Sequence, residues 1–204
     1  MARVGRPREF DRDEALRKAL ELFWSQGYEG TTLTDLQKAM GGITAPSFYA
    51  AFGSKEDLFR ETVQLYNRVE GAPLLKALME GRTARSSIGS LLHAAVESFS
   101  NPSNPKGCFM VLGAINCGRS NRHVEDFMQE QRALREKVIK QRLRRAISEG
   151  DLPKSADIGV LASFYSALLD GLALHARDGA PRKTLLGIVE RAMDAWEVVA
   201  TTIR

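Results

Sequence analysis

Apolar side chains recur at intervals of three and four residues along most of the chain, a pattern typical of amphipathic helices. The first stripe, from Leu16 to Phe23, follows Asp11 and Glu14, whose spacing is typical of a capping box at a helix start. We expect this helix to end at Gly27, because glycine is common just past a helix end. Similar stripes continue to the C-terminus, so the sequence predicts an all-α fold.

A glycine pair at 41–42 separates two short helical patterns. Thr32 or Thr34 can cap the first helix, and Thr44 followed by a proline can start the second. Helices of about two turns are too short to be stable alone, so we interpret them as a helix-turn-helix that packs on the first helix. The expected core of this three-helix unit consists of Leu16, Leu20, Phe23, Leu36, Ile43, Phe48 and Phe52.

Beyond this unit the pattern predicts a larger helical region. Ser54 can cap a helix that continues towards Glu70, whereas residues 71–85 contain two glycines and a proline and are interpreted as a broken connection. Leu74, Leu75, Leu78 and Met79 within this segment would suit a helical turn pressed on the core. The other expected helices are a stripe from Ile88 to Phe99, a buried central helix at 107–117, a long helix from Val124 to Gly150, and two final helices at about 155–178 and 182–203. For the segment 107–117 an internal strand is the alternative to a helix, but partner strands are lacking.

The helix at about 155–178 is apolar on more than one face. Its main stripe consists of Leu161, Tyr165, Leu168 and Leu172, and the apolar residues off this stripe are Val160, Phe164 and Leu174. A helix that is apolar on two sides must bury surface beyond its own core. We therefore expect the last two helices to pair with their copies in a four-helix homodimer interface, the alternative being a monomeric bundle.

Composition is ordinary for a soluble globular protein, with 44% hydrophobic and 26% charged residues. We find no apolar run that approaches the roughly 18 residues of a membrane span and no apolar signal segment, so we expect a cytoplasmic protein without membrane contact. Cys108 and Cys117 suggest neither a disulfide framework nor a metal site, and no cofactor is expected. On a single buried helix they would lie on opposite sides, which argues against a local disulfide switch.

The net charge of +4 permits a polyanionic partner, but the placement of the charges is more informative. Arg3, Arg6 and Arg8 lie in a glycine- and proline-containing arm that could reach a DNA minor groove or phosphates, the alternative being a disordered tail. The basic residues between 119 and 145 are interpreted as a solvated helical face. They are spread around the helix without interleaved aromatic residues, which disfavours a second nucleic-acid surface.

Residues 8–59 contain the segments REFDRDEALRKALELFWSQGYEG and GTTLTDLQKAMGGITAPSFYAAFGSKEDLF, and this part of the chain resembles the TetR family of bacterial transcriptional regulators. The matching features are the helix ending at Gly27-Tyr28, the threonine-rich start of the second helix, Phe48-Tyr49, Phe52, and Ser54-Lys55-Glu56 leading to Leu58-Phe59. Two positions depart from the family pattern. The turn at Gly41-Gly42 has one extra residue, which could change the angle of the recognition helix, and Gln37 replaces a usually small residue.

The resemblance implies that the helix at 44–52 enters the major groove while Thr32, Tyr49 and Lys55 hold phosphates. Hydroxyls and a lysine at a helix start are natural phosphate ligands. A core position is the alternative for Tyr49, and a merely solvated position is the alternative for Lys55.

Direct reading of bases is expected from the short side chains at the start of the same helix. Ser47 can form a hydrogen bond to a base edge, and Ala45 can contact a thymine methyl group. Thr44 completes the DNA-binding set.

The resemblance also implies a small-molecule effector pocket among the middle helices. By residue type, the expected lining is mainly apolar with one polar orienting group. It consists of Val96, Met110, Phe127, Gln131, Phe164 and Leu168, each of which has a plain core position as its alternative. The three histidines lack the spacing of metal ligands.

The sequence thus predicts an arm and helix-turn-helix DNA-binding domain at 1–54 and a helical effector-binding and dimerisation domain at 55–204. The expected function is a sequence-specific transcriptional regulator, by default a repressor, that binds a near-palindromic operator as a dimer and is released by a small molecule. We find no Ser-His-Asp signature, phosphate loop or zinc motif, so no enzyme is expected. The alternative is a helical ligand-binding or interaction protein that does not bind DNA specifically.

Overall fold

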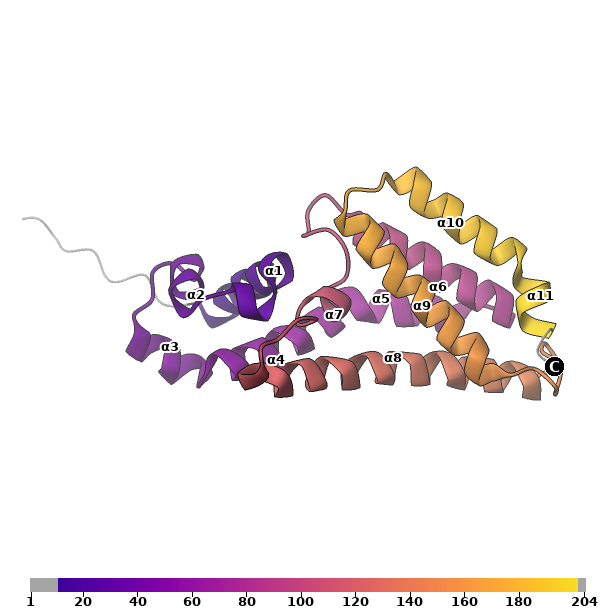
Figure 1. Ribbon diagram of the computed structural model, residues 1–204, viewed down its shortest axis with the longest axis horizontal. Helices are drawn as coiled ribbons and strands as arrows, with labels where there is room; N and C mark the ends of the chain where they lie inside the picture. The colour runs from indigo at the N-terminus through magenta and orange to yellow at the C-terminus, as the bar shows by residue number, and fades with distance from the viewer. Residues whose placement is uncertain (1–10, 202–204) are drawn as a thin grey trace, which may run out of the picture.

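The computed structural model describes residues 11–201, and within that range the regular elements are all helices, as predicted. Residues 11–54 form a small head at one end of an elongated helical body, which consists of residues 55–201 (Figure 1). The elements in chain order are α1 (Arg12–Gly30), α2 (Leu33–Ala39), α3 (Ala45–Phe52), α4 (Lys55–Tyr66), the π-helix η1 (Asn67–Gly71), α5 (Ala72–Glu80), α6 (Ala84–Phe99), α7 (Phe109–Leu112), the 3-10 helix η2 (Arg119–Asn121), α8 (Arg122–Ser148), α9 (Ile158–Arg177), α10 (Arg182–Asp194) and α11 (Trp196–Thr201).

The head is specified by helix starts that the sequence marks clearly. The Asp11 carboxylate accepts hydrogen bonds of 3.0 Å from the amides of Asp13 and Glu14, as expected for the cap of α1. Gly27 has a φ of +74°, and this break ends the regular part of α1 where the sequence predicts. Every residue of the predicted head core is buried except Ile43, which is half-buried and packs against it.

The turn between α2 and α3 depends on its two glycines. Gly41 and Gly42 have φ values of +85° and +79°, a region that side chains with a Cβ rarely adopt. Thr44 then caps α3, and Pro46 lies in its first turn. The predicted helix-turn-helix is therefore present, with both glycines required by the backbone.

The helix after the head is longer than the sequence suggests. The chain continues from α4 through η1 into α5, so the expected broken connection at 71–85 is wrong for Ala72–Glu80. Pro73 lies in the first turn of α5, where the adjoining π-helical turn accommodates it without a break. The backbone leaves the helical path only at Gly81.

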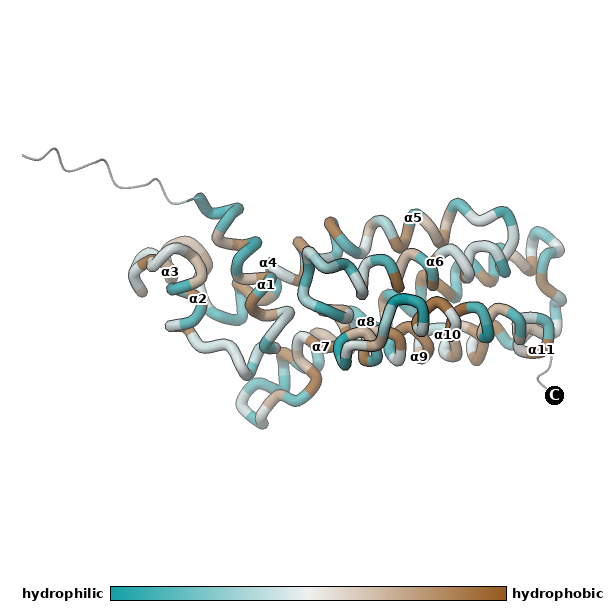
Figure 2. The backbone as a smooth tube through the Cα atoms, turned by 90° about the horizontal axis from the view of Figure 1, so that it is seen from above, coloured by the Kyte–Doolittle hydropathy of each residue, from teal (hydrophilic) through white to brown (hydrophobic). Residues whose placement is uncertain are grey.

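The body is a bundle in which α8, 27 residues long, runs along the whole length (Figure 1). Seen from above, α5 and α6 lie along one side of the body and α9 and α10 along the other (Figure 2). The predicted stripes of these helices are buried between them, for example Leu92, Leu161 and Leu185. These buried side chains belong to one hydrophobic core that continues into the head.

The expected central helix at 107–117 is present only as the single turn α7, although most of the segment is buried. The helix ends at Gly113, whose carbonyl oxygen accepts a 2.7 Å hydrogen bond from the Tyr28 amide of the head instead of continuing a helical hydrogen-bond pattern. Cys108 and Cys117 therefore do not share one helix, and the predicted placement of the two cysteines on opposite sides of a single helix is wrong. Both cysteines are free.

The basic residues of α8 agree in part with the predicted solvated face: Arg122, Lys137, Arg144 and Arg145 are exposed, whereas Arg142 and Arg135 are not. Arg142 is fully buried, and its guanidinium donates hydrogen bonds to the Ser87 hydroxyl at 2.8 Å and the Gly81 carbonyl at 3.2 Å. Arg135 forms a 2.5 Å ion pair with Asp170 on α9. These arginines hold helices together instead of facing solvent.

Helix α9 contradicts the expectation that no apolar stretch approaches membrane-spanning length. It has 20 residues and a window of mean hydropathy 1.4, so by length and composition alone it could cross a membrane. In the structure, 39% of that window is buried inside the body, against α6, α8 and α10. Its apolar residues face more than one direction, as the sequence predicts.

Candidate DNA-recognition surface and effector pocket

Helix α3 presents one buried and one exposed face. Phe48 and Phe52 point into the head and are buried, with their rings 5.8 Å apart. The exposed residues of α3 and its cap are small or neutral and consist of Thr44, Pro46, Ser47, Tyr49 and Ala50. Because α3 has no charged side chain, this face can approach a base edge closely, while charge must come from its surroundings.

The predicted base-reading residues occupy different environments. Ser47 is exposed, and its hydroxyl lies 3.0 Å from that of Thr44, which also caps the Ser47 amide at 3.4 Å. Ala45 is half-buried, so it presents less surface to a partner than the sequence suggests. Pro46 and Ala50 are exposed on this helix but were not among the predicted contacts. Pro46 and Ala50 are four residues apart and each lies two residues from the apolar Phe48, so they share the side of the helix that faces away from it. This spacing in the sequence could have indicated that both are exposed.

Tyr49 and Lys55 lie on either side of the α3–α4 junction. Tyr49 is 53% exposed, which excludes the core position, and its ring packs edge-on against Phe48 at 5.5 Å. Lys55 is the first residue of α4, and its ammonium nitrogen lies 4.1 Å from the centre of the Tyr28 ring. Burial lowers the pKa of Lys55, and the nearby Glu29 carboxylate opposes that change. Lys55 is therefore held in place instead of being freely solvated.

The cap of α2 brings an acid close to one predicted phosphate ligand. The Thr32 hydroxyl donates to the Asp35 carboxylate at 2.6 Å and accepts from the Asp35 amide at 3.1 Å. These bonds from Thr32 lower the pKa of Asp35, so its carboxylate is charged beside the exposed threonine. Thr32 is therefore exposed, but its hydroxyl is already hydrogen-bonded to Asp35. Arg3, Arg6 and Arg8 lie outside the described residues.

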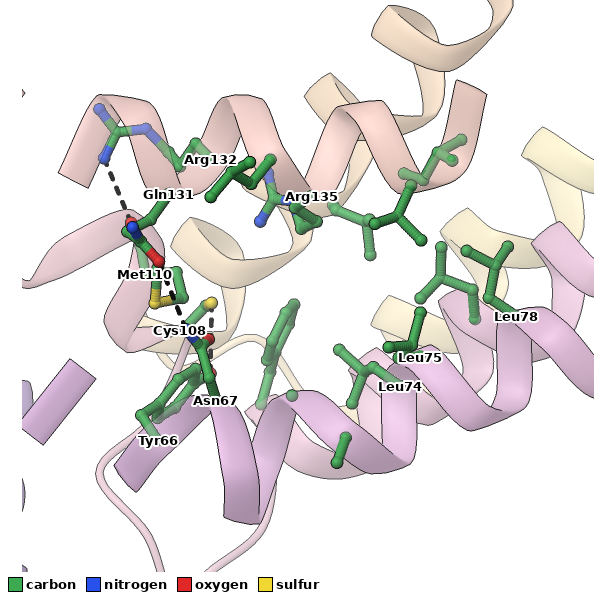
Figure 3. Close-up of a pocket in the computed structure, with 18 residues that line it drawn as sticks. Tyr66, Asn67, Leu74, Leu75, Leu78, Cys108, Met110, Gln131, Arg132 and Arg135 are labelled. Atoms are coloured by element: carbon green, nitrogen blue, oxygen red, sulfur yellow. Dashed lines mark hydrogen bonds between the residues drawn. The ribbon is translucent and has the colours of Figure 1, made fainter. Parts of the chain in front are cut away.

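A cavity of about 330 Å³ lies in the body between α4–α5 and α8 (Figure 3). Most of its wall is aliphatic or aromatic, with polar groups from α4, η1, α7 and α8. Its lining includes Asn67, Leu75, Cys108, Gln131, Arg132, Leu134 and Arg135. The Tyr66 hydroxyl donates to the Cys108 sulfur at 3.3 Å, and burial raises the pKa of Tyr66.

Only part of the predicted pocket lining meets at this cavity. Met110 and Gln131 line it, whereas Val96, Phe127, Phe164 and Leu168 do not. Val96 is buried in α6, Leu168 packs half-buried against the core, and Phe164 is exposed on α9. The Phe127 ring lies beneath the Arg60 guanidinium at 4.2 Å.

A set of contacts connects the segment after α7 to the end of α1. Besides the Tyr28–Gly113 hydrogen bond, the Glu29 carboxylate accepts from the Gly118 amide at 2.6 Å and the Asn121 side chain at 3.0 Å. The Asn121 and Gly118 hydrogen bonds lower the pKa of Glu29. Because α7 also forms part of the cavity wall, this segment joins the cavity to the head.

Among residues 11–201, no group of three or more histidine, cysteine, aspartate or glutamate side chains could hold a metal ion. His123 instead lies 2.8 Å from the Glu56 carboxylate, where it links α8 to α4. This histidine therefore contributes to contacts between helices.

Comparison with known proteins identifies the head and the body separately. Residues 15–62 match the family described as bacterial regulatory proteins, tetR family, and residues 84–182 match the tetracyclin repressor-like C-terminal domain. The HTH-type transcriptional repressor ComR of Escherichia coli (strain K12) is 32% identical over 193 residues, 94% of this chain and 91% of ComR. The HTH-type transcriptional repressor BdcR of the same strain is 27% identical and aligns over 96% of this chain and 93% of BdcR.

Solved structures agree with these matches. A double cysteine mutant of the TetR family transcriptional regulator CifR, complexed with 26-bp double-strand operator DNA, has a TM-score of 0.90 and 42% identity to this chain. The match covers 94% of this chain and all of the CifR chain. The chain described here therefore belongs to the TetR family of bacterial regulatory proteins and is a DNA-binding transcriptional regulator, not an enzyme.

Proposed function

We propose that the protein is a homodimeric repressor in which residues 1–54 read a near-palindromic operator and residues 55–204 bind an effector and dimerise. The observation that carries the proposal is the exposed, uncharged face of α3, backed by the buried Phe48 and Phe52. A helix with this construction can enter a major groove while its back face keeps it fixed on the head. Because operator DNA is the partner, the protein acts in the bacterial cytoplasm.

The surroundings of α3 supply the phosphate contacts. Lys55 lies at the start of α4 and Tyr49 is exposed on α3, where an ammonium and a hydroxyl donor suit phosphate oxygens. Thr32 lies at the start of α2, and its hydroxyl would have to turn from Asp35 to donate to a phosphate. We assign base contacts to Ser47, Thr44 and, with a smaller exposed surface, Ala45. The arginines of the N-terminal arm contribute further charge.

The dimer interface is assigned to α9 and α10. Val160, Phe164 and Leu174 are 51%, 41% and 48% exposed, and together they form an apolar patch on α9. At 100° per residue they lie on one face of α9, roughly 80° wide, together with Ala167 and Gly171. A Cβ added at Gly171 would meet nothing within 4 Å, so a partner helix has room to approach there. Two copies of this face, flanked by α10, would form a four-helix interface.

Effector binding in the cavity would change the heads through two connections. One is the continuous helical path α4–η1–α5, whose Tyr66 and Asn67 line the cavity. The other is α7, whose neighbour Gly113 accepts the Tyr28 hydrogen bond. Either connection would alter the spacing of the two recognition helices, and with it the operator affinity.

The experiment that tests this proposal is selection of genomic fragments by the full-length protein, followed by affinity measurements on the best fragment at two salt concentrations. We expect a near-palindromic site that binds at least about 1,000-fold tighter than scrambled DNA of equal length. Its affinity should fall steeply with salt, because phosphate contacts release counterions. If no fragment exceeds scrambled DNA at either salt concentration, the ligand-binding or interaction protein becomes the better description.

A further inference from the structure

The cavity combines an apolar body with a polar end that carries positive charge but no acid. Among the described residues that line it, the charged side chains are Arg132 and Arg135 alone. Figure 3 shows both on α8, with Gln131 and Met110 near Arg132, Asn67 reaching Gln131 from the opposite helix, and the leucines of α5 further along the cavity. The lining therefore has two ends of different chemistry.

Arg132 lacks an acidic partner within the described chain. Its guanidinium donates one hydrogen bond, to the Met110 carbonyl oxygen at 3.2 Å. A neutral carbonyl does not compensate a full charge, and a guanidinium forms stronger hydrogen bonds to a carboxylate. Arg132 can therefore accept an anionic ligand without giving up an ion pair.

Arg135 supplies a second unfilled donor next to Arg132. It is three residues further along α8 and hence on the same side of the helix. Its terminal nitrogen is paired with Asp170, but its Nε is buried and has no hydrogen-bond partner among the described residues. A buried donor without a partner is costly, and a ligand oxygen would remove that cost.

The rest of the cavity suits a flexible apolar chain. Leu74, Leu75 and Leu78 of α5 lie further along the cavity from Arg132 (Figure 3), and Phe99 and Leu169 add to its apolar lining. Leu75 and Leu134 line the cavity while remaining 45% and 54% exposed, so it opens between α5 and α8 through an apolar rim. The volume of about 330 Å³ is at the small end of the roughly 300–1,000 Å³ typical of ligand sites.

From these observations we infer that the effector is an amphipathic carboxylate, with its head group on Arg132 and Arg135 and its apolar chain against α5. The inference deepens the proposed function, since it names the ligand class of the effector pocket. A cationic molecule would be repelled by the uncompensated Arg132, and a neutral molecule of equal length would lose the charge-assisted hydrogen bonds.

The test compares octanoate, 1-octanol and octylamine by calorimetric titration into the full-length protein without DNA. Octanoate is expected to bind at least about tenfold tighter than 1-octanol, with octylamine the weakest. Equal affinities for octanoate and 1-octanol, tighter binding of 1-octanol or octylamine, or no binding of any probe would overturn the inference.

Variants of two arginines on α8 test whether Arg132 causes the preference for octanoate. Arg132→Met keeps an apolar stem and should remove the preference for octanoate, whereas Arg132→Lys should keep most of it because the charge remains. Arg144→Met makes the same charge change at an exposed position of the same helix and should bind as the wild type does. A preference that survives in Arg132→Met, with folding confirmed by circular dichroism, contradicts the assignment.

Operator binding is measured separately, so that an error in the ligand class can be distinguished from an error in the proposed function. If the protein binds its operator and a neutral molecule releases it while octanoate does not bind, the ligand class is wrong and the proposed function stands. If no operator is bound even in the absence of any ligand, the proposed function fails.

Discussion

The recognition surface on α3 is made of residues within one short segment, whereas the cavity is lined by α4, η1, α5, α6, α7, α8 and α9. The surface depends on caps, a glycine pair and two phenylalanines, all of which act over a few residues. The cavity depends on where helices distant in sequence come to rest. A change in the head should therefore act mainly on DNA affinity, and a change in the body on stability, assembly and ligand response.

The largest effect is expected at Arg142 in the body. Arg142→Ala removes a buried side chain, takes the donor from the Ser87 hydroxyl, and leaves the Gly81 carbonyl with one donor, the Ser87 hydroxyl, in place of two. We expect the free energy of unfolding in urea to fall by about 3–4 kcal/mol. Arg144→Ala, exposed on the same helix, should change it by no more than about 0.5 kcal/mol. Equal values for the two variants would contradict a role for Arg142 in holding the bundle.

Assembly is tested by a charge on the exposed face of α9. Phe164→Asp should yield a folded monomer in sedimentation experiments and lower operator affinity about 100-fold or more, because two linked heads are lost. Val69→Asp places the same charge at an exposed apolar position on η1 and should leave the dimer intact. A dimeric Phe164→Asp protein with unchanged affinity would remove this face from the interface.

Phosphate contacts in the head should give a smaller, uniform effect. Tyr49→Ala and Lys55→Ala are each expected to weaken binding to operator and scrambled DNA alike, by about tenfold. Fluorescence anisotropy on both DNAs measures this, with unfolding curves to check that the head is intact. A loss confined to the operator would mean that these residues read bases.

The smallest effect is expected from the Glu29 contacts between head and body. Its folded pKa is lowered by the Asn121 and Gly118 hydrogen bonds, so its contribution to stability is present above the unfolded pKa of about 4.3. That contribution is lost as the pH falls through the lowered folded pKa. Melting temperatures of the wild type and Glu29→Gln should differ slightly at pH 6, and the difference should shrink as the pH is lowered from 6 to 3. A constant difference over this range would exclude the carboxylate charge as the cause.

The contrast between local signals in the head and long-range packing in the body also explains which parts of the fold the sequence predicts. The caps at Asp11, Thr32 and Ser54 and the turn at Gly41-Gly42 are local signals, and the structure contains each of them. The structure of the segment at 107–117 could not be predicted in this way, because its apolar pattern does not indicate that the Tyr28 amide donates a hydrogen bond to the Gly113 carbonyl. Its partner lies far away in the sequence.

The cavity could not be predicted from residue type for a related reason. Met110 and Gln131 were found, but Val96 and Phe164 have similar chemistry and lie elsewhere. Arg132 was missed, because a basic helix gives the same sequence pattern whether its arginines face solvent or a cavity. Only packing distinguishes these cases.

The central claim is that α3 reads the operator through its small side chains. The most direct measurement is the affinity of the wild type, Ser47→Ala and Tyr49→Ala for every single-base change of the selected operator. The claim predicts a changed base preference at matching positions of both half-sites for Ser47→Ala, and an evenly lowered profile for Tyr49→Ala. An evenly lowered profile for Ser47→Ala together with a changed base preference for Tyr49→Ala would contradict it.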